Sequence, residues 1–337
     1  MRKSFGLIRS AAALTFGLCC VSAAQAVPYT GLYAFGDSLS DVGNDLLITN
    51  NTVPDPAIYT DGTNTGRFTN GLNYLDVLAG SLGLSPLAPS VTGGTDYAYG
   101  GARTTYIAPG LVPLGGLSFN QQIGAYDLAH TTADPNALYV LWIGANDMGD
   151  AIGAYLGGNA TAISSAITVA MTGIGTAIGN LASRGAEHFL VPNLPDLALT
   201  PRIGGLGSSF VEGVAQGASM EFNHQLALLL GGISGLDIRS MDVYGWLNDV
   251  VAAPSAYGFT DVAHSCYTGD VDGSSIGVPI TTCANPSQYA FWDYEHPTAA
   301  LHAELGALAF AAVPEPSTLA LLGLGLTWLG FSRRKAA

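Results

Sequence analysis

The sequence predicts a single α/β domain in which helices cover both faces of a mainly parallel β-sheet. Short apolar or β-branched runs of strand length alternate with longer runs whose apolar residues recur every three or four positions. Such alternation is typical of a parallel sheet with crossover helices. No fixed-period repeat and no long linker interrupts residues 27–313, so one domain is expected there.

The predicted elements follow one another along that domain. Strands are expected at 32–35, 96–99, 137–143, 188–193 and 236–243. Helices are expected at 73–83, 118–130, 161–184 and 209–230, with a last one after Pro297. The helix over 161–184 is the clearest, because one face repeats apolar residues: Ile163, Ile167, Met171, Ile174, Ile178 and Leu181. In such sheets, functional sites form at the carboxyl ends of the strands.

The N-terminus has the pattern of a secretory signal peptide. Arg2, Lys3 and Arg9 precede the apolar stretch AAALTFGLCCV, which is followed by the small-residue sequence AQA at 24–26. We therefore expect residues 1–26 to be removed by signal peptidase during export. The alternative is that this stretch is a buried first helix.

The C-terminus combines a Pro-Glu-Pro sequence at 314–316, an apolar run and the basic residues Arg333, Arg334 and Lys335. The run of about 15 residues is short for a stable span, which needs about 20. Residues 314–337 resemble the PEP-CTERM sorting tail of Gram-negative bacteria. The resemblance implies transient membrane association and processing by an exosortase; the alternative is a permanent anchor.

The domain between these tails is strongly acidic. Its five basic residues, all arginines, stand against 24 Asp and Glu residues, so its net charge is −19. Such a surface repels nucleic acids and anionic membranes, so no nucleic-acid partner is expected. Catalysis by a lysine is excluded, because 27–313 contains none.

Cysteine and histidine spacing predicts a disulfide and no metal site. Only Cys266 and Cys283 remain after removal of the signal peptide, and an isolated pair in an exported protein is most simply a disulfide. No CxxC occurs, and the histidines lack the spacing of zinc ligands.

Three glycine-containing motifs follow predicted strands. In 36-GDSL-39, Ser38 is either a nucleophile at the start of a helix or a helix cap, although Ser40 and Asp41 could also cap. In 97-YAYGGART-104, the Gly101 N–H could stabilise an oxyanion, or the glycines could simply form a tight turn. In 142-WIGAND-147, the Asn146 amide could do the same, or form an Asx turn.

A fourth motif, 291-FWDYEHPT-298, supplies a candidate base. Asp293 and His296 are three residues apart, so one turn can bring the carboxylate to the imidazole and orient it. The sequence 273-GSSIG-277 formally matches a G-x-S-x-G nucleophile elbow. Ser275 is disfavoured, because this serine lies in a polar loop without the strand and helix that an elbow requires.

Together these blocks resemble the SGNH/GDSL family of esterases and lipases, in its lipase-acylhydrolase branch. The segments 66-GRFTNG-71 and 193-NLPDLALTP-201 support the resemblance, which covers about 32–310. One departure is Asp96, where relatives often carry asparagine. The resemblance implies an SGNH hydrolase-like, flavodoxin-like α/β/α sandwich. It also implies Ser38 as nucleophile, His296 as base and Asp293 as its orienter.

The implied oxyanion hole consists of the Ser38 N–H, the Gly101 N–H and the Asn146 side chain, and no cofactor is implied. The expected function is a secreted serine esterase or lipase that hydrolyses carboxylic esters through an acyl-enzyme. It would act in the periplasm, at the cell surface or outside the cell. One alternative is acyl transfer or polysaccharide deacetylation at the surface, since such tails often accompany exopolysaccharide production. Another is a non-catalytic surface binding protein on the same fold.

Overall fold

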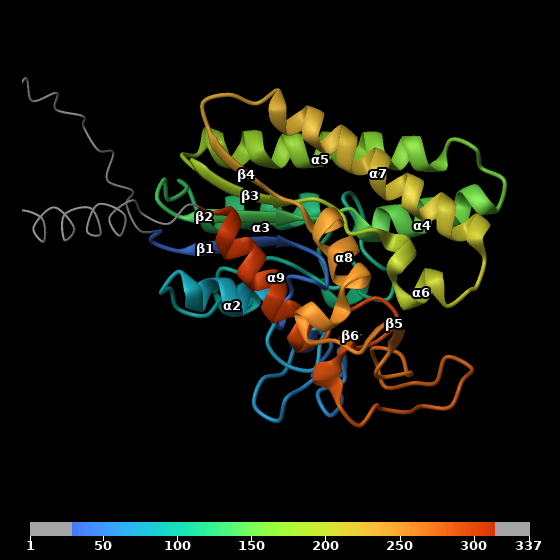
Figure 1. Ribbon diagram of the computed structural model, residues 1–337. Helices are drawn as coiled ribbons and strands as arrows, with labels where there is room; N and C mark the ends of the chain where they lie inside the picture. Colours follow the sequence, from blue (N-terminus) through green and yellow to red (C-terminus); the bar gives the residue numbers. More distant parts are fainter. Residues whose placement is uncertain (1–28, 314–337) are drawn as a thin grey trace, which may run out of the picture. The chain divides into compact units, whose positions relative to one another are not determined.

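A computed structural model describes residues 29–313, and their centre is a parallel four-stranded sheet (Figure 1). The predicted signal peptide and the sorting tail from 314 onward lie outside the described residues. The strands lie side by side in sequence order: β1 (Leu32–Gly36), β2 (Leu138–Trp142), β3 (His188–Pro192) and β4 (Asp237–Met241). Four of the five predicted strands are thus present. All three pairings are parallel.

The predicted strand at 96–99 is not a regular strand, although its chain runs parallel to β1. Tyr97 N–H donates to Ala34 O at 2.8 Å, and Tyr99 N–H donates to Gly36 O at 3.3 Å. Between them, the Ala98 N–H bonds to the Asp96 side chain at 3.0 Å. The Ala98 N–H points away from β1, so this bond does not interrupt the pairing. The ladder is interrupted where the Gly36 N–H, which would bond the Tyr97 carbonyl in a continuous parallel ladder, donates to Gln122 Oε1 at 2.8 Å instead. Counting this segment as the second strand gives the order 2-1-3-4-5, which is the flavodoxin order.

Helices cover both faces of the sheet, as predicted (Figure 1). One face carries α3 (Phe119–Ala129), α4 (Ala145–Leu156), α5 (Ala162–Ser183) and α7 (Ser209–Gly231). The other face carries α2 (Tyr74–Ser81) and α9 (Ala299–Ala312). Val243, the first residue of α8 (Val243–Ala252), packs on the same face. Tyrosine, phenylalanine and aliphatic side chains fill both interlayer spaces. The chain is therefore a three-layer α/β/α sandwich.

The predicted buried face of α5 is confirmed at Ile167, Ile174, Ile178 and Leu181, which are buried, whereas Ile163 and Met171 are partly buried. The helix is long and apolar enough to cross a membrane by composition alone, but it packs against α3, α4 and α7 as a core helix.

Several elements were not predicted. Helices α4 and α8 follow β2 and β4 directly. For the segment around Asn146 the sequence leaves a loop as the alternative, and the strand predicted over 236–243 extends into the first residue of α8. A second, two-stranded parallel sheet joins β5 (Asp261–Ser265) to β6 (Tyr289–Phe291). The short helices are α1 (Asn44–Ile48), α6 (Pro201–Gly204) and the 3-10 turns 90–92, 112–114, 197–199, 254–257 and 286–288.

The predicted disulfide joins Cys266 to Cys283. It closes the connection between β5 and β6, and Tyr59, Tyr267 and Trp292 pack around it. Closing a loop of this length contributes about 3 kcal/mol in the chain-entropy model. The segment that delivers Asp293 and His296 follows directly after β6, so this small sheet supports the site.

Candidate active site

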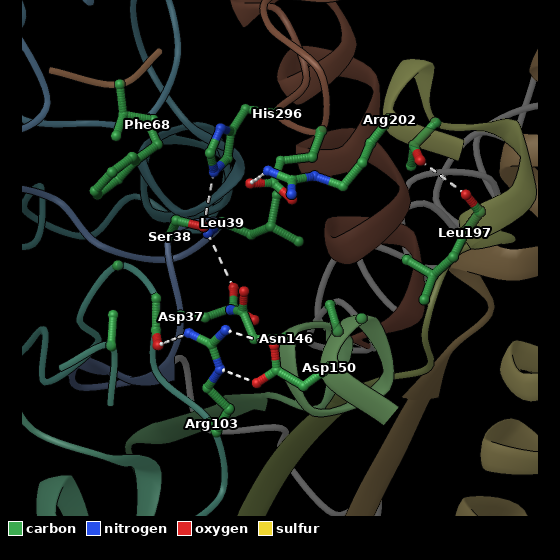
Figure 2. Close-up of a pocket in the computed structure, with 18 of the residues that line it drawn as sticks. Asp37, Ser38, Leu39, Phe68, Arg103, Asn146, Asp150, Leu197, Arg202 and His296 are labelled. Atoms are coloured by element: carbon green, nitrogen blue, oxygen red, sulfur yellow. Dashed lines mark hydrogen bonds and ion pairs between the residues drawn. The ribbon is translucent and has the colours of Figure 1, made fainter. Parts of the chain in front are cut away.

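A cavity of about 490 Å³ lies beyond the carboxyl ends of β1 and β2 (Figure 2). Ser38, Gly101, Asn146 and His296 all border it, so the structure brings four of the five predicted site residues to one wall. This place is the switch point of the sheet, where strand order reverses between β1 and its neighbours and where ligands bind in such folds. Asp293 lies behind His296, buried.

Ser38 lies in a turn over residues 37–40 directly after β1, and not at a helix start as expected. Helix α1 begins only at Asn44, and its first N–H groups are bonded by Asp41 instead. Ser38 therefore does not cap a helix. The Gln122 side chain on α3 holds the end of β1 in place. It accepts the Gly36 N–H and donates to the Gly36 carbonyl, each at 2.8 Å.

Ser38, His296 and Asp293 form a continuous hydrogen-bonded chain. Ser38 Oγ lies 2.8 Å from His296 Nε2, and His296 Nδ1 lies 2.7 Å from Asp293 Oδ2. The three-residue spacing works because Asp293 Oδ1 accepts the backbone N–H groups of Glu295 and His296, which closes a tight turn. Phe68 packs against the imidazole at a ring distance of 5.3 Å.

The electrostatics of this pair favour an ionised carboxylate and a basic imidazole. Burial opposes ionisation of Asp293, but the His296 charge and hydrogen bonds from His296, Glu295 N–H and Tyr59 lower its pKa below the usual value. Burial would lower the pKa of His296, yet the adjacent Asp293 carboxylate outweighs it and raises that pKa above 6.5. The imidazole can therefore accept a proton from Ser38 and hold it beside a negative charge.

The candidate oxyanion donors come from two different elements. Gly101 has a φ of +67°, a backbone conformation that favours glycine, and it follows Gly100, where a Cβ would lie 2.3 Å from the Phe68 ring. Asn146 lies in the first turn of α4, and not in an Asx turn. Its Nδ2 donates to Ala102 O at 3.1 Å, which leaves one amide hydrogen free of that bond.

A group of buried carboxyl groups lies beneath the Ser38 turn. Asp41 accepts four backbone N–H groups, and Asp96 accepts those of Val42 and Ala98. Neither carboxyl oxygen of Asp45 has a hydrogen-bond partner in the described chain. Burial raises the pKa of Asp41 to about 6, and burial with neighbouring carboxylates raises those of Asp45 and Asp96 well above the usual range.

Asp37 borders the cavity beside the nucleophile candidate. Burial raises its pKa to about 7, although the Leu39 N–H bond and the His296 charge act in the opposite direction. Asp96 stands where relatives often carry asparagine. A carboxylate suits this position, because it accepts two backbone N–H groups there.

Ser275 lies apart from this chemistry. It is exposed in the loop between the two cysteines, where its Oγ donates to Val278 O at 2.8 Å. Within residues 29–313, no three His, Cys, Asp or Glu side chains gather in a way that could hold a metal ion.

Two supporting residues escaped sequence reasoning. Tyr59 is fully buried and donates to Asp293 Oδ2 at 2.7 Å, from a position 234 residues away. Arg103 borders the cavity and forms an ion pair with Asp150 (Figure 2). No local sequence pattern predicts Tyr59, because it lies in an irregular loop. Arg103 lies within the predicted motif at 97–104 and could have been noticed there.

Comparison with known proteins agrees with the geometry. A family model described as GDSL-like lipase/acylhydrolase matches residues 32–309. The chain belongs to this family. A PEP-CTERM protein-sorting motif matches residues 312–335 and indicates export and sorting in a Gram-negative bacterium.

Relatives of this GDSL family member include a GDSL esterase/lipase of Arabidopsis thaliana, 28% identical over 80% of this chain and 85% of that protein. Another Arabidopsis relative, 25% identical over 84% of this chain and 72% of its own length, is named an inactive GDSL esterase/lipase-like protein. A solved lipase from a goat rumen metagenome matches 84% of this chain and 97% of its own, with 14% identity and a TM-score of 0.44. Family membership supports ester hydrolysis in general, and the finer assignment must come from the site.

Proposed function

We propose that the protein is an exported serine esterase or lipase that hydrolyses carboxylic esters through an acyl-enzyme. The observation that carries the proposal is the chain of hydrogen bonds from Ser38 through His296 to Asp293 on the wall of the cavity. A hydroxyl, an imidazole and a carboxylate in this order are the groups that nucleophilic acyl transfer requires.

In the proposed mechanism, Ser38 Oγ attacks the ester carbonyl while His296 Nε2 takes its proton. The Asp293 carboxylate stabilises the resulting imidazolium through Nδ1. The Ser38 N–H, the Gly101 N–H and the Asn146 amide stabilise the oxyanion. His296 then protonates the departing alkoxide, and a water molecule activated by the same imidazole releases the acid.

The cavity supports an acyl or alkyl group of moderate size. Its walls include apolar side chains from segments far apart in the chain: Leu39, Val53, Phe68, Leu111, Ile152, Leu197, Ile203 and Val271. We further propose that residues 1–26 direct export, that 27–313 form the hydrolase domain and that 314–337 are the sorting tail. The enzyme would then act in the periplasm or at the cell surface.

The test compares wild type with Ser38→Ala on nitrophenyl esters of increasing acyl length, long-chain lipids and acetylated glycans. We expect ester hydrolysis to fall by about 10³-fold or more in Ser38→Ala, while Ser275→Ala keeps wild-type rates. Labelling by a fluorophosphonate should map to Ser38. Full activity of Ser38→Ala would refute Ser38 as the nucleophile in favour of another serine. Release of acetate from glycans alone would refute the lipase version of the proposal in favour of a deacetylase.

The binding-protein alternative makes a different prediction in the same experiment. One relative is named an inactive GDSL esterase/lipase-like protein, so membership of the family does not by itself establish activity. If wild type neither hydrolyses any ester nor reacts with the fluorophosphonate, the protein is a binding module and the catalytic roles above are wrong.

A further inference from the structure

Arg103 connects the two halves of the candidate oxyanion hole. All three of its guanidinium nitrogens donate to protein acceptors: Nε and Nη2 bond both carboxyl oxygens of Asp150 at 2.8 and 3.0 Å, and Nη1 bonds Gly101 O at 2.7 Å. Gly101 belongs to the loop after the 95–99 segment, whereas Asp150 lies on α4, one turn beyond Asn146. The guanidinium therefore spans the space between the Gly101 peptide and the helix that carries Asn146 (Figure 2).

Three further contacts join the same loop to the same helix. The Tyr106 hydroxyl donates to Asp150 Oδ2 at 2.7 Å. Asn146 Nδ2 donates to Ala102 O, and the Asp147 carboxylate accepts the Thr104 N–H through both oxygens, at 3.1 and 3.0 Å. The last two are backbone contacts of the loop, and they would persist in an Arg103 variant. The Gly101 carbonyl also accepts the Ala108 N–H at 3.3 Å, but among the contacts that lead to α4 only the Arg103 bond reaches Gly101. This carbonyl belongs to the peptide that follows the Gly101 N–H, so Arg103 holds the donor through the Gly101 Cα.

The guanidinium is poorly available to a substrate, although it borders the cavity. The Arg103 side chain is 17% exposed, and the Asp150 carboxylate compensates its charge. The other arginine of the cavity, Arg202, differs, because its side chain is 58% exposed and bonds Glu295 through one nitrogen. A planar fork with each nitrogen occupied suits a structural brace better than an anion receptor.

We propose that Arg103, held by Asp150, is a positioning residue that fixes the Gly101 peptide relative to Asn146, so that both donors point at one oxyanion. This inference rests on the proposed esterase function. Without the brace, the Gly101 N–H can move away from the position that the oxyanion occupies. Because oxyanion donors act mainly in the transition state, the loss should appear in kcat and leave KM nearly unchanged.

The experiment measures kcat and KM of the full domain on an uncharged short-chain ester, for wild type and three variants of the brace. Displacement of a catalytic group by about 1 Å can cost about 100-fold, so we expect Arg103→Gln to lower kcat by about 10- to 100-fold, with KM within about threefold. Arg103→Lys should not restore kcat, since an ammonium group cannot make the three-way contact. Asp150→Asn should lower kcat by about three- to tenfold, because the amide keeps one acceptor oxygen.

Arg184→Gln is the matched control. Arg184 also forms an ion pair, with Asp127, and a hydrogen bond to a backbone carbonyl, that of His130. It follows α5 at the edge of the sheet where β3 begins, and it does not line the cavity. Its kcat should stay within twofold of wild type. The rate at which a phosphonate ester inactivates each variant should follow kcat, because the phosphonyl oxygen occupies the oxyanion position.

The outcomes separate the two proposals. A wild type that hydrolyses the ester, with an unchanged kcat and a raised KM in Arg103→Gln, overturns the brace and makes Arg103 a substrate-binding residue. Full rescue by Arg103→Lys also overturns it. If Arg103→Gln does not fold, Asp150→Asn decides alone, and a kcat within twofold of wild type refutes the inference. A wild type that neither hydrolyses esters nor reacts with the phosphonate refutes the proposed function, and the brace with it.

Discussion

The two segments that meet at Ser38 both contain buried aspartates, but the pKa of the buried aspartate is lowered in one segment and raised in the other. In the turn after β6, Asp293 is buried and its pKa lies below the usual value. In the segment after β1, Asp37 and Asp41 are equally buried, and their pKa values rise to about 7 and about 6. The residue type and the degree of burial are the same, so the difference comes from the partners of each carboxyl group.

The partners differ in charge rather than in number. Asp293 has an imidazole that can become a cation and a tyrosine hydroxyl beside it. Asp41 accepts four neutral backbone N–H groups but lies next to the acids Asp45 and Asp96. For Asp293, an imidazole that is both charged and directly hydrogen-bonded outweighs burial. The His296 charge acting on Asp37 without such a bond, and the neutral N–H groups around Asp41, only partly offset burial. The turn after β6, the charge region, thus holds an ionised carboxylate. In the segment after β1, the region of backbone support, the carboxyl groups serve to bind backbone N–H groups.

Asp293→Asn should have the largest effect on catalysis, because it removes the negative charge that stabilises the His296 imidazolium. An amide does not stabilise the imidazolium and favours the wrong tautomer, so we expect kcat to fall by about 10³- to 10⁴-fold. Ester hydrolysis at pH 8, with the thermal midpoint as a folding control, measures this. A loss below tenfold would mean that the Asp293 charge is not used.

The matched pair Asp41→Asn and Asp45→Asn tests the region of backbone support. In Asp41→Asn one side-chain position becomes a donor that faces two backbone N–H groups, and we expect a loss of about 3 kcal/mol in unfolding free energy. Asp45 has no bonds to lose, so the same change should cost less than about 1 kcal/mol. Urea unfolding at pH 7 measures both. Equal losses would contradict the division of roles.

The pH dependence of stability should separate the regions further. The pKa of Asp37 in the folded protein lies above its unfolded value, so the folded state binds more protons and stability falls as pH rises from about 4 to about 7. The full shift corresponds to about 4 kcal/mol, and we expect Asp37→Asn to remove about half of that, because Asp37 borders an open cavity. Unfolding free energies at pH 4.5 and 7.5 test this. An unchanged pH dependence in the variant would show that other acids cause it.

Tyr59→Phe should have the smallest effect of the four. It removes one hydrogen bond to Asp293 but leaves the imidazole and two backbone N–H groups in place. We expect kcat to fall about two- to fivefold, or about 0.4 to 1 kcal/mol. This is less than the roughly 1.5 to 3 kcal/mol of a typical hydrogen bond to a charged group, because the remaining partners still hold the carboxylate. Steady-state kinetics across pH 6 to 9 measures it. A loss comparable with that of Asp293→Asn would make Tyr59 part of the charge region rather than its support.

The sequence predicted the sheet, its helical layers and the places of Ser38, Gly101, Asn146 and His296 for one physical reason. Carboxyl ends of parallel strands meet at one edge, so correct strand positions bring their following loops together. It could not predict Tyr59, because the loop that carries it has no periodicity. It also misjudged 96–99, since the distant Gln122 side chain accepts the Gly36 N–H that a regular strand at 96–99 would have bonded. Helix α4 was missed because its glycine-rich start is typical of a turn.

The bond between Ser38 and His296 joins positions 258 residues apart, one near each end of the domain. Under the proposed mechanism, a chain that is still being exported has its serine outside long before its base. The hydroxyl stays an ordinary alcohol until the last turn and α9 have folded onto the sheet. Hydrolytic activity would then begin only on completion of export, so that a truncated or stalled chain does no chemistry on the lipids around it.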